Sequence, residues 1–151
     1  MSFIEWSDEQ FAIGVERVDE QHRRLFDLLN ELYAAVQEGA GTEAVEDVIA
    51  ELEDYTYHHF EDEETYMDEC GFADECEGCF LAQENAHRGF EEQVSELRDR
   101  FESGDADVEM QTLRFLRTWI AEHVAGMDQQ IGTYLEEGAE DLEPMEMSVT
   151  E

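Results

Sequence analysis

Four segments of the chain repeat their apolar residues at intervals of three and four, and each includes a histidine in that repeat. This interval brings side chains onto one face of an α-helix, so each segment predicts a helix with one stripe facing the interior. The stripes comprise His22, Leu25, Leu29, Leu32 and Val36; Val45, Ile49, Leu52, Thr56, His59, Glu63 and Met67; Phe80, Gln83, His87, Phe90, Val94, Leu97 and Phe101; and Leu113, Leu116, Ile120, His123, Met127 and Tyr134.

Residues that start or stop helices separate these segments. Asp19 is the expected N-cap of the first helix, which ends at residues 39–41. The second helix begins after Thr42 and ends near residues 70–71, and the third ends at residues 103–104. Short connections favour antiparallel neighbours. We therefore predict an all-α fold, an up-down antiparallel four-helix bundle whose core can hold a cofactor.

The two ends of the chain flank this bundle. Residues 1–16 are expected to form an arm that packs Phe3, Trp6 and Phe11 on the helices. The length of 151 residues suits one domain. We expect the bundle domain to span residues 1–136 and a loose, acidic C-terminal tail to span residues 137–151.

The charge of the chain restricts its partners. There are 42 acidic and 8 basic residues, all arginine, and the formal charge is −34. Such a chain repels nucleic acid and anionic membranes. Because molar salt screens its self-repulsion, we expect a salt-rich cytoplasm. No apolar run could span a bilayer, and the first residues lack the basic region of a secretory signal, so a cytoplasmic protein is expected.

The polar residues of the stripes form a candidate metal site in the bundle core. His59 and Glu63 are four residues apart, so both can point at one ion. His58 and Asp62 have the same spacing but lie on the polar face of the helix, and we expect His58 to be exposed. The full candidate set contains His22, His59, Glu63, His87, His123 and Asp128.

A buried ionised carboxylate must be paired, bound to a metal or protonated, which leaves two interpretations of Glu63 and Asp128. They could simply accept hydrogen bonds from core histidines. A histidine from each of four helices favours a metal site instead. Imidazole with carboxylate, and no thiolate on the stripes, suits iron or manganese better than structural zinc. Since a carboxylate can bridge two ions, the set supports a dinuclear centre, for which oxygen is the obvious ligand.

The spacing of His123 and Asp128 departs from a regular helix. Five residues separate them by about 140° on a straight α-helix. Either both reach the centre from the flanks of one face, or a π-bulge near Gly126 brings them into line.

These residues resemble the hemerythrin family in its single-domain prokaryotic form, and the resemblance covers most of the chain. It rests on an ordered set of residues: Trp6, Gly14-Val15, Asp19-Glu20-Gln21-His22, Leu25 and Asn30; Tyr55, His59-Phe60, Glu63-Glu64 and Met67; His87 and Phe90; and Trp119, His123 and Asp128.

The resemblance implies a diiron centre, bridged by oxo or hydroxo, that binds oxygen reversibly. His22 and His59 would hold the iron that takes oxygen, His87 and His123 would hold the second iron, and Glu63 and Asp128 would bridge them. Leu25, Phe60, Trp119 and Ile120 are the expected walls of a dry pocket.

One position departs from the family pattern. The pattern in the third helix is two histidines separated by three residues, whereas this chain has Gln83 in the first of these positions, before His87. Three interpretations are open: the Gln83 amide oxygen ligates iron weakly, Glu84 supplies a carboxylate, or water fills the position. Each would change the second iron more than the iron that takes oxygen.

The loop before the third helix is longer than the family pattern and contains Cys70, Cys76 and Cys79. A Cys-x-x-Cys pair suits a redox switch or half of a zinc site, but no second pair completes four ligands. In a reducing cytoplasm we expect free thiols or a regulated disulfide.

We therefore expect an oxygen-binding protein for storage, transport or sensing rather than an enzyme. The alternatives are a diiron oxidase or reductase acting on peroxide, nitric oxide or oxygen, and a metal-binding module that has lost reversible oxygen binding. A monomer and a small homo-oligomer are both open.

Overall fold

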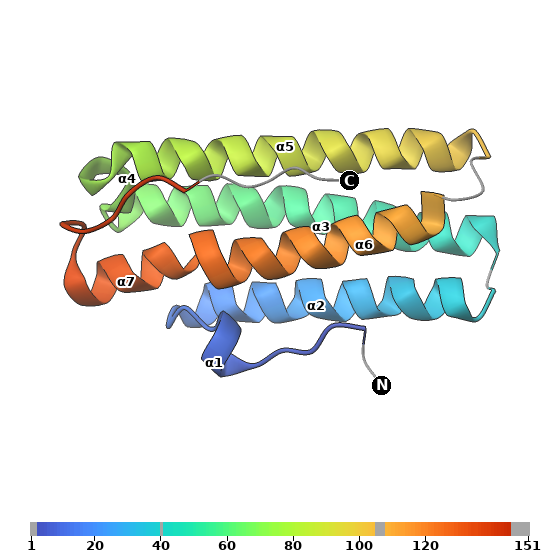
Figure 1. Ribbon diagram of the computed structural model, residues 1–151, viewed down its shortest axis with the longest axis horizontal. Helices are drawn as coiled ribbons and strands as arrows, with labels where there is room; N and C mark the ends of the chain where they lie inside the picture. Colours follow the sequence, from blue (N-terminus) through green and yellow to red (C-terminus); the bar gives the residue numbers. More distant parts are fainter. Residues whose placement is uncertain (1–2, 40, 105–107, 146–151) are drawn as a thin grey trace.

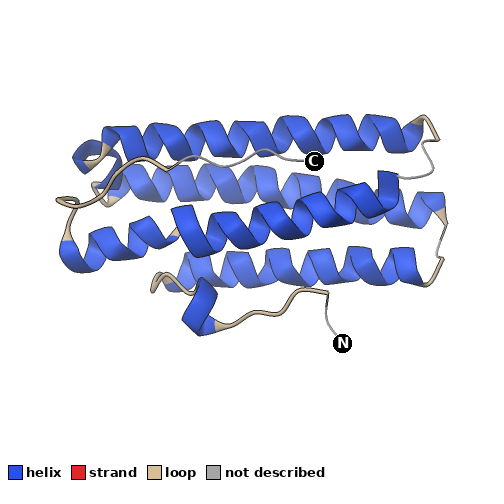
Figure 2. Ribbon diagram, in the orientation of Figure 1, coloured by secondary structure: helices blue, strands red, loops and turns tan. Residues whose placement is uncertain are grey.

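The computed structural model of this protein describes residues 3–39, 41–104 and 108–145, and these residues form helices joined by short connections (Figure 1). No strand occurs in these ranges (Figure 2). The helices are α1 (Asp8–Phe11), α2 (Glu16–Gln37), α3 (Thr42–Glu69), α4 (Phe72–Glu75), α5 (Glu77–Glu102), α6 (Val108–Glu122), the π-helix η1 (His123–Met127) and α7 (Gln129–Glu137).

Four long helices form the bundle. Helix α2 packs against α3, α3 against α5, α5 against α6, and α6 against α2, which closes the ring. Helices α2 and α5 run in one direction and α3 and α6 in the other (Figure 1). The predicted all-α, up-down antiparallel four-helix bundle is therefore confirmed. None of the described helices is long and apolar enough to cross a membrane.

The helix ends agree with the glycine signals, but the predicted start of the first helix is wrong. Helix α2 begins at Glu16, and its N-cap Val15 lies four residues before the predicted cap at Asp19. Asp19 instead lies in the first turn, where its carboxylate accepts hydrogen bonds from the backbone N–H of Ile13 (2.8 Å) and Gly14 (3.2 Å). It therefore anchors the preceding segment to the helix start, where a negative charge is favourable.

The buried apolar residues form two clusters. The larger fills the bundle between α2, α3, α5 and α6. The smaller, which we name the end cluster, closes the end of the bundle where α3 meets α5. Its buried members are Ile13, Val18, Met67, Phe72, Cys79 and Ile131, with Cys70, Cys76 and Leu142 packed against them.

The expected N-terminal arm is confirmed. Phe3 stacks on Tyr33 with ring centroids 4.4 Å apart, and Phe11 packs edge-on against Phe26 at 4.8 Å. Trp6 also contacts Phe26, at 5.3 Å.

The described part of the C-terminal tail contacts the bundle, where the sequence predicted a loose segment. Leu142 packs on the end cluster, and the side-chain amide of Gln130 donates a 2.7 Å hydrogen bond to the carbonyl of Glu143. Residues 146–151 lie outside the described residues. The division of the chain at residue 136 stays a prediction.

Candidate metal centre

The seven predicted site residues converge in the middle of the bundle, and none is more than 2% exposed. Helix α2 contributes His22, α3 contributes His59 and Glu63, and α5 contributes Gln83 and His87. His123 begins η1, and Asp128 follows its last residue. Side chains from four helices thus meet where water cannot reach them.

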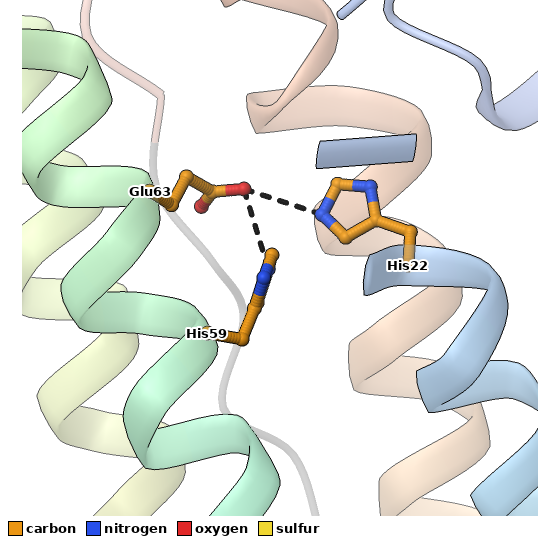
Figure 3. Close-up of side chains that lie close together, drawn as sticks. All are labelled: His22, His59 and Glu63. Atoms are coloured by element: carbon orange, nitrogen blue, oxygen red, sulfur yellow. Dashed lines mark hydrogen bonds and ion pairs between the residues drawn. The ribbon is translucent and has the colours of Figure 1, made fainter. Parts of the chain in front are cut away.

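The two oxygens of Glu63 face different pairs of histidines. Oε2 lies 3.2 Å from Nε2 of His22 and 3.4 Å from Nε2 of His59 (Figure 3). Oε1 lies 3.1 Å from Nε2 of His87 and 3.9 Å from Nε2 of His123. This carboxylate therefore stands between two separate imidazole pairs.

Asp128 repeats this division from the other side. Its Oδ2 lies 3.1 Å from Nε2 of His22, and its Oδ1 lies 3.2 Å from Nε2 of His123. Two groups of candidate ligand atoms result, one with His22 and His59 and the other with His87 and His123, and both include Glu63. One carboxylate oxygen for each half is the arrangement that bridges two ions.

The π-helix aligns His123 with Asp128. The backbone N–H of Asp128 donates a 3.0 Å hydrogen bond to the carbonyl of His123, five residues earlier. The wider turn returns the fifth residue to the same face, whereas a regular α-helix would rotate it away. Of the two alternatives that the sequence left open, the structure has the π-bulge near Gly126.

Two of the four imidazoles are oriented by hydrogen bonds on their outer nitrogen. His59 Nδ1 donates to Oε1 of Gln21 at 2.7 Å, and His87 Nδ1 donates to Oε2 of Glu64 at 2.7 Å. A proton on Nδ1 leaves the lone pair on Nε2, which points into the centre, as metal ligation requires. Nδ1 of His22 and His123 has no hydrogen-bond partner among the described residues.

Gln83 occupies the position at which the family pattern has a histidine. Its Nε2 donates a 3.0 Å hydrogen bond to Oδ1 of Asp128, while its buried Oε1 has no hydrogen-bond partner among the described residues. Such an oxygen is costly to bury unless it gains a partner. Glu84 is half-buried and belongs to neither group of candidate ligands in the described chain.

A cavity of about 10 Å³ adjoins four of the candidate ligands, His22, His59, His123 and Asp128. This is at the lower limit of the space that can hold one water molecule. Its lining includes all four predicted walls and further residues that the sequence did not single out for this role: Leu25, Phe60, Trp119 and Ile120, with Thr56, Phe90 and Val124.

Comparisons with known proteins agree with this geometry. Residues 13–135 match the family model described as the hemerythrin HHE cation binding domain. The chain belongs to the hemerythrin family. The bacteriohemerythrin of Methylococcus capsulatus is 32% identical over 135 residues, which is 89% of this chain and 98% of that relative. The bacteriohemerythrin of Stenotrophomonas maltophilia is 36% identical over 129 residues, 85% of this chain and 79% of that relative.

A crystal structure of wild-type hemerythrin has the same fold. It superposes with a TM-score of 0.77 at 30% identity, and the match covers 87% of this chain and 96% of the crystallised hemerythrin chain. The hemerythrin resemblance drawn from the sequence is thus confirmed.

Ionisation in this centre follows from burial and from the two carboxylates. Burial would lower the pKa of His22, but hydrogen bonds and charge from Asp128 and Glu63 raise it to about 10. Burial would also lower the pKa of His123, but Asp128 and Glu63 raise it to about 9. Burial lowers the pKa of His59. At neutral pH, protons on His22 and His123 therefore balance the carboxylates, and bound cations would displace them.

The carboxylates stay ionised despite burial. Burial would raise the pKa of Glu63, but the imidazoles of His59, His123 and His22 hold it well below its ordinary range. Burial and the charge of Glu63 raise the pKa of Asp128, yet His123 and His22 lower it overall. Anionic oxygens and inward imidazole nitrogens fit a pair of borderline cations such as iron.

The structure also corrects the assignment of the α5 stripe. Cys79 is fully buried on it and Phe80 only partly, so a sulfur does lie among the stripe positions. It is bonded to Cys76 and is in neither candidate ligand group. His58 is exposed, as predicted, with its Nε2 3.5 Å from Asp54.

Sequence reasoning gave no role to Gln21 or Glu64, which orient two candidate ligands. Gln21 directly precedes His22, and Glu64 directly follows Glu63. A polar residue beside a ligand was the available signal. It could not show which ring nitrogen the side chain would reach across the interface.

Proposed function

We propose that this protein binds oxygen reversibly at a diiron centre held by His22, His59, Glu63, Gln83, His87, His123 and Asp128. The carrying observation is the division of the Glu63 and Asp128 oxygens between two imidazole pairs, at separations of 3.1 to 3.4 Å for five of the six contacts. Two carboxylates that each face both halves suit two ions held side by side. A set of paired core histidines alone would need no such symmetry.

The two halves have different proposed roles. Both histidines of the half with His22 and His59 line the cavity, whereas the other half contributes only His123, so the first half is the one where oxygen would enter. When bound, the iron pair supplies two electrons and an open coordination position. Leu25, Phe60 and Trp119 exclude water from that position, which favours release of oxygen unchanged.

Gln83 is the proposed seventh ligand through Oε1. Its Nε2 already donates to Asp128, so the amide is oriented with the oxygen free to reach an ion. The half-buried position of Glu84, outside both candidate groups, supports Gln83 over that carboxylate. Water remains the alternative ligand.

The test is optical. Protein loaded anaerobically with ferrous iron should bind about two ions per chain, develop a visible absorption band with oxygen, and lose it when oxygen is removed. His59→Gln should abolish the band. His58→Gln, which changes the exposed neighbour on the same helix, should leave it unchanged. Clearly fewer than two ions per chain, or equal effects of the two variants, would contradict the proposal.

The weaker donor at Gln83 specifically favours one second candidate, a diiron oxidase or reductase. With amide or water in place of imidazole, the half with His87 and His123 has an additional exchangeable position, which suits reaction with peroxide, nitric oxide or oxygen. In the same experiment this function would appear as irreversible oxidation and turnover. Oxidation without turnover would indicate a metal-binding module that has lost reversible oxygen binding.

A further inference from the structure

A disulfide that the proposed oxygen chemistry does not use lies at the start of α5. Cys76 and Cys79 are bonded to each other, while Cys70 is a free thiol. Cys76 is the N-cap of α5 and is partly exposed, and its sulfur accepts a 3.3 Å hydrogen bond from the backbone N–H of Cys79. Cys79 is fully buried. Of the two residues, Cys76 is therefore the one that is partly open to a reagent, and Cys79 is closed to it.

The buried sulfur shares a stripe with the candidate metal centre. Cys79, Gln83 and His87 follow one another at intervals of four on α5, and all three are fully buried. Cys79 also belongs to the end cluster, beside Met67, which lies one turn beyond Glu63 on α3. A change at Cys79 thus acts on the helical turn that positions Gln83.

The C-terminal tail covers the turn between the two cysteines. A side-chain carbon added to Gly78 would lie 2.8 Å from Cγ of Pro144, so the tail is in close contact with the turn. The tail is held there by the hydrogen bond from Gln130 to the carbonyl of Glu143 and by Leu142 in the end cluster. A reagent that approaches this turn from the side of Gly78 must therefore displace the tail.

We propose that Cys76 and Cys79 form a reversible dithiol–disulfide couple, exchanged with a dithiol partner at the sulfur of Cys76, that controls how firmly the Gln83 side of the centre is held. The coupling to metal rests on the proposed function. The exchange and its effect on α5 do not.

The exchange proceeds in two balanced steps. A thiolate of the partner attacks Sγ of Cys76, the Cys76–Cys79 bond breaks, and Cys79 leaves as a thiolate that takes up a proton. The second thiol of the partner then attacks the mixed disulfide and releases Cys76, whose developing charge is stabilised by the N–H of Cys79 at the helix start. Two electrons and two protons pass to the cysteine pair, and the partner becomes a disulfide. Oxidation by a partner disulfide is the reverse.

The exchange is tested first on metal-free protein. Reduced dithiothreitol should raise the number of titratable thiols from one to three, since the chain has three cysteines, and oxidised dithiothreitol should return it to one. Gly78→Ala, which collides with Pro144, should accelerate reduction, by about tenfold if the tail limits access. Gly89→Ala, on the same helix with open space around it, should not change the rate. A thiol count that stays at one would overturn the exchange. Equal reduction rates for the two variants would overturn the covering role of the tail.

The effect on the centre is tested by hydrogen exchange and by metal release. In the metal-free protein, reduction should speed amide exchange in the first turns of α5, up to Gln83, and leave the middle of α2 unchanged. In protein loaded with ferrous iron, reduction should speed loss of one of the two ions to a chelator by about tenfold. Unchanged exchange in α5 would overturn the coupling even if no metal bound.

Two cysteine variants separate this effect from a general effect of reductant. Cys76→Ser removes the disulfide but retains a good N-cap, so it should behave as the reduced protein under all conditions. Cys70→Ser keeps the disulfide and should behave as the wild type. If Cys76→Ser released metal at the rate of the oxidised wild type, the disulfide would have no part in holding the centre.

Discussion

At the scale of single residues, Gln83 is as deeply buried as the candidate histidine ligands, but its amide is a weaker metal donor than imidazole. The nitrogen of its amide donates a hydrogen bond to Asp128, and the oxygen of the same amide has no partner among the described residues. The centre is therefore asymmetric in chemistry although nearly symmetric in geometry, and the difference is carried by one side chain.

Replacing Gln83 tests this asymmetry. Gln83→His should slow release of one of the two ions by about tenfold or more, because imidazole is a stronger donor than amide. Chelator competition followed by metal analysis measures this rate. Glu84→Gln is the control, since that side chain lies outside both candidate groups, and it should release metal as the wild type does. A faster release in the control would instead assign a ligand role to Glu84.

Glu64 is expected to act through His87. Its Oε2 accepts from Nδ1 of His87 and from Nη2 of Arg88 at 3.0 Å. These partners lower the pKa of Glu64 despite its partial burial, so a full charge faces the imidazole. Glu64→Gln should lower metal affinity by about tenfold, measured by competition titration. The exposed neighbour Glu61, changed to Gln, should have no such effect.

The histidine pKa values predict a pH dependence for the metal-free protein. The pKa values of His22 and His123 rise from 6.5 when unfolded to about 10 and about 9 when folded. Their contribution to the free energy of unfolding is full below pH 6.5 and is lost as pH rises towards 10, at up to about 1.4 kcal/mol per pH unit for each proton. Urea unfolding at pH 6.5, 8 and 9.5 measures this loss. His123→Gln should flatten the curve, and His58→Gln should not.

At the scale of elements, the helices with a long apolar repeat and a glycine stop could be predicted from the sequence. Helix α4 could not, because its four residues, Phe72–Glu75, are too short to show a period. The start of α2 was misplaced because aspartate is a common N-cap residue, whereas Asp19 lies inside the helix and accepts a hydrogen bond from the backbone N–H of Ile13. Because His59 continues the apolar stripe and His58 falls on the polar face, the repeat alone was sufficient to identify the buried histidine.

The remainder of the site depends on contacts between elements. Nothing in the periodicity of α2 indicates that Gln21 reaches His59 on α3, or that Glu64 on α3 reaches His87 on α5. The Cys-x-x-Cys spacing permitted a disulfide, but the burial of Cys79 on the ligand stripe required the helix to begin at Glu77, one turn earlier than the apolar repeat suggests.

The packing of α7 against the arm gives a prediction at this scale. A side-chain carbon added to Gly132 would lie 2.5 Å from the backbone carbonyl oxygen of Ile13, so Gly132→Ala must displace the segment that Asp19 anchors. We expect a loss of about 1–3 kcal/mol in the free energy of unfolding, as for overpacked cores. Gly89→Ala has open space and should gain up to about 1 kcal/mol. Equal urea midpoints for the two variants would contradict this.

At the scale of the whole molecule, the balance of 42 acidic and 8 basic residues dominates. Some of the arginines bridge neighbouring helices: Arg24 joins α2 to Glu51 on α3, and Arg98 joins α5 to Glu53 on α3. Exposed pairs such as these contribute little each, so they cannot offset the excess of negative charge.

The stability of the whole molecule should therefore increase with salt. Raising sodium chloride from 0.1 to 1 M shortens the screening length from about 10 to about 3 Å and should raise the unfolding temperature. Calorimetry of the metal-free protein measures the change. Sucrose at matched osmolarity separates screening from exclusion of solute from the surface, and an equal rise in sucrose would contradict an electrostatic origin.

The π-helix has a consequence for anyone who transplants this centre. Between His123 and Asp128 the chain contains one residue more than an unbroken α-helix would need to return to the same face. A designed bundle with uniform heptads therefore has no register at which all seven side chains can be grafted unchanged. The graft requires a single-residue insertion in the last helix, and alignments of this region should place a gap there whenever a related helix lacks the bulge.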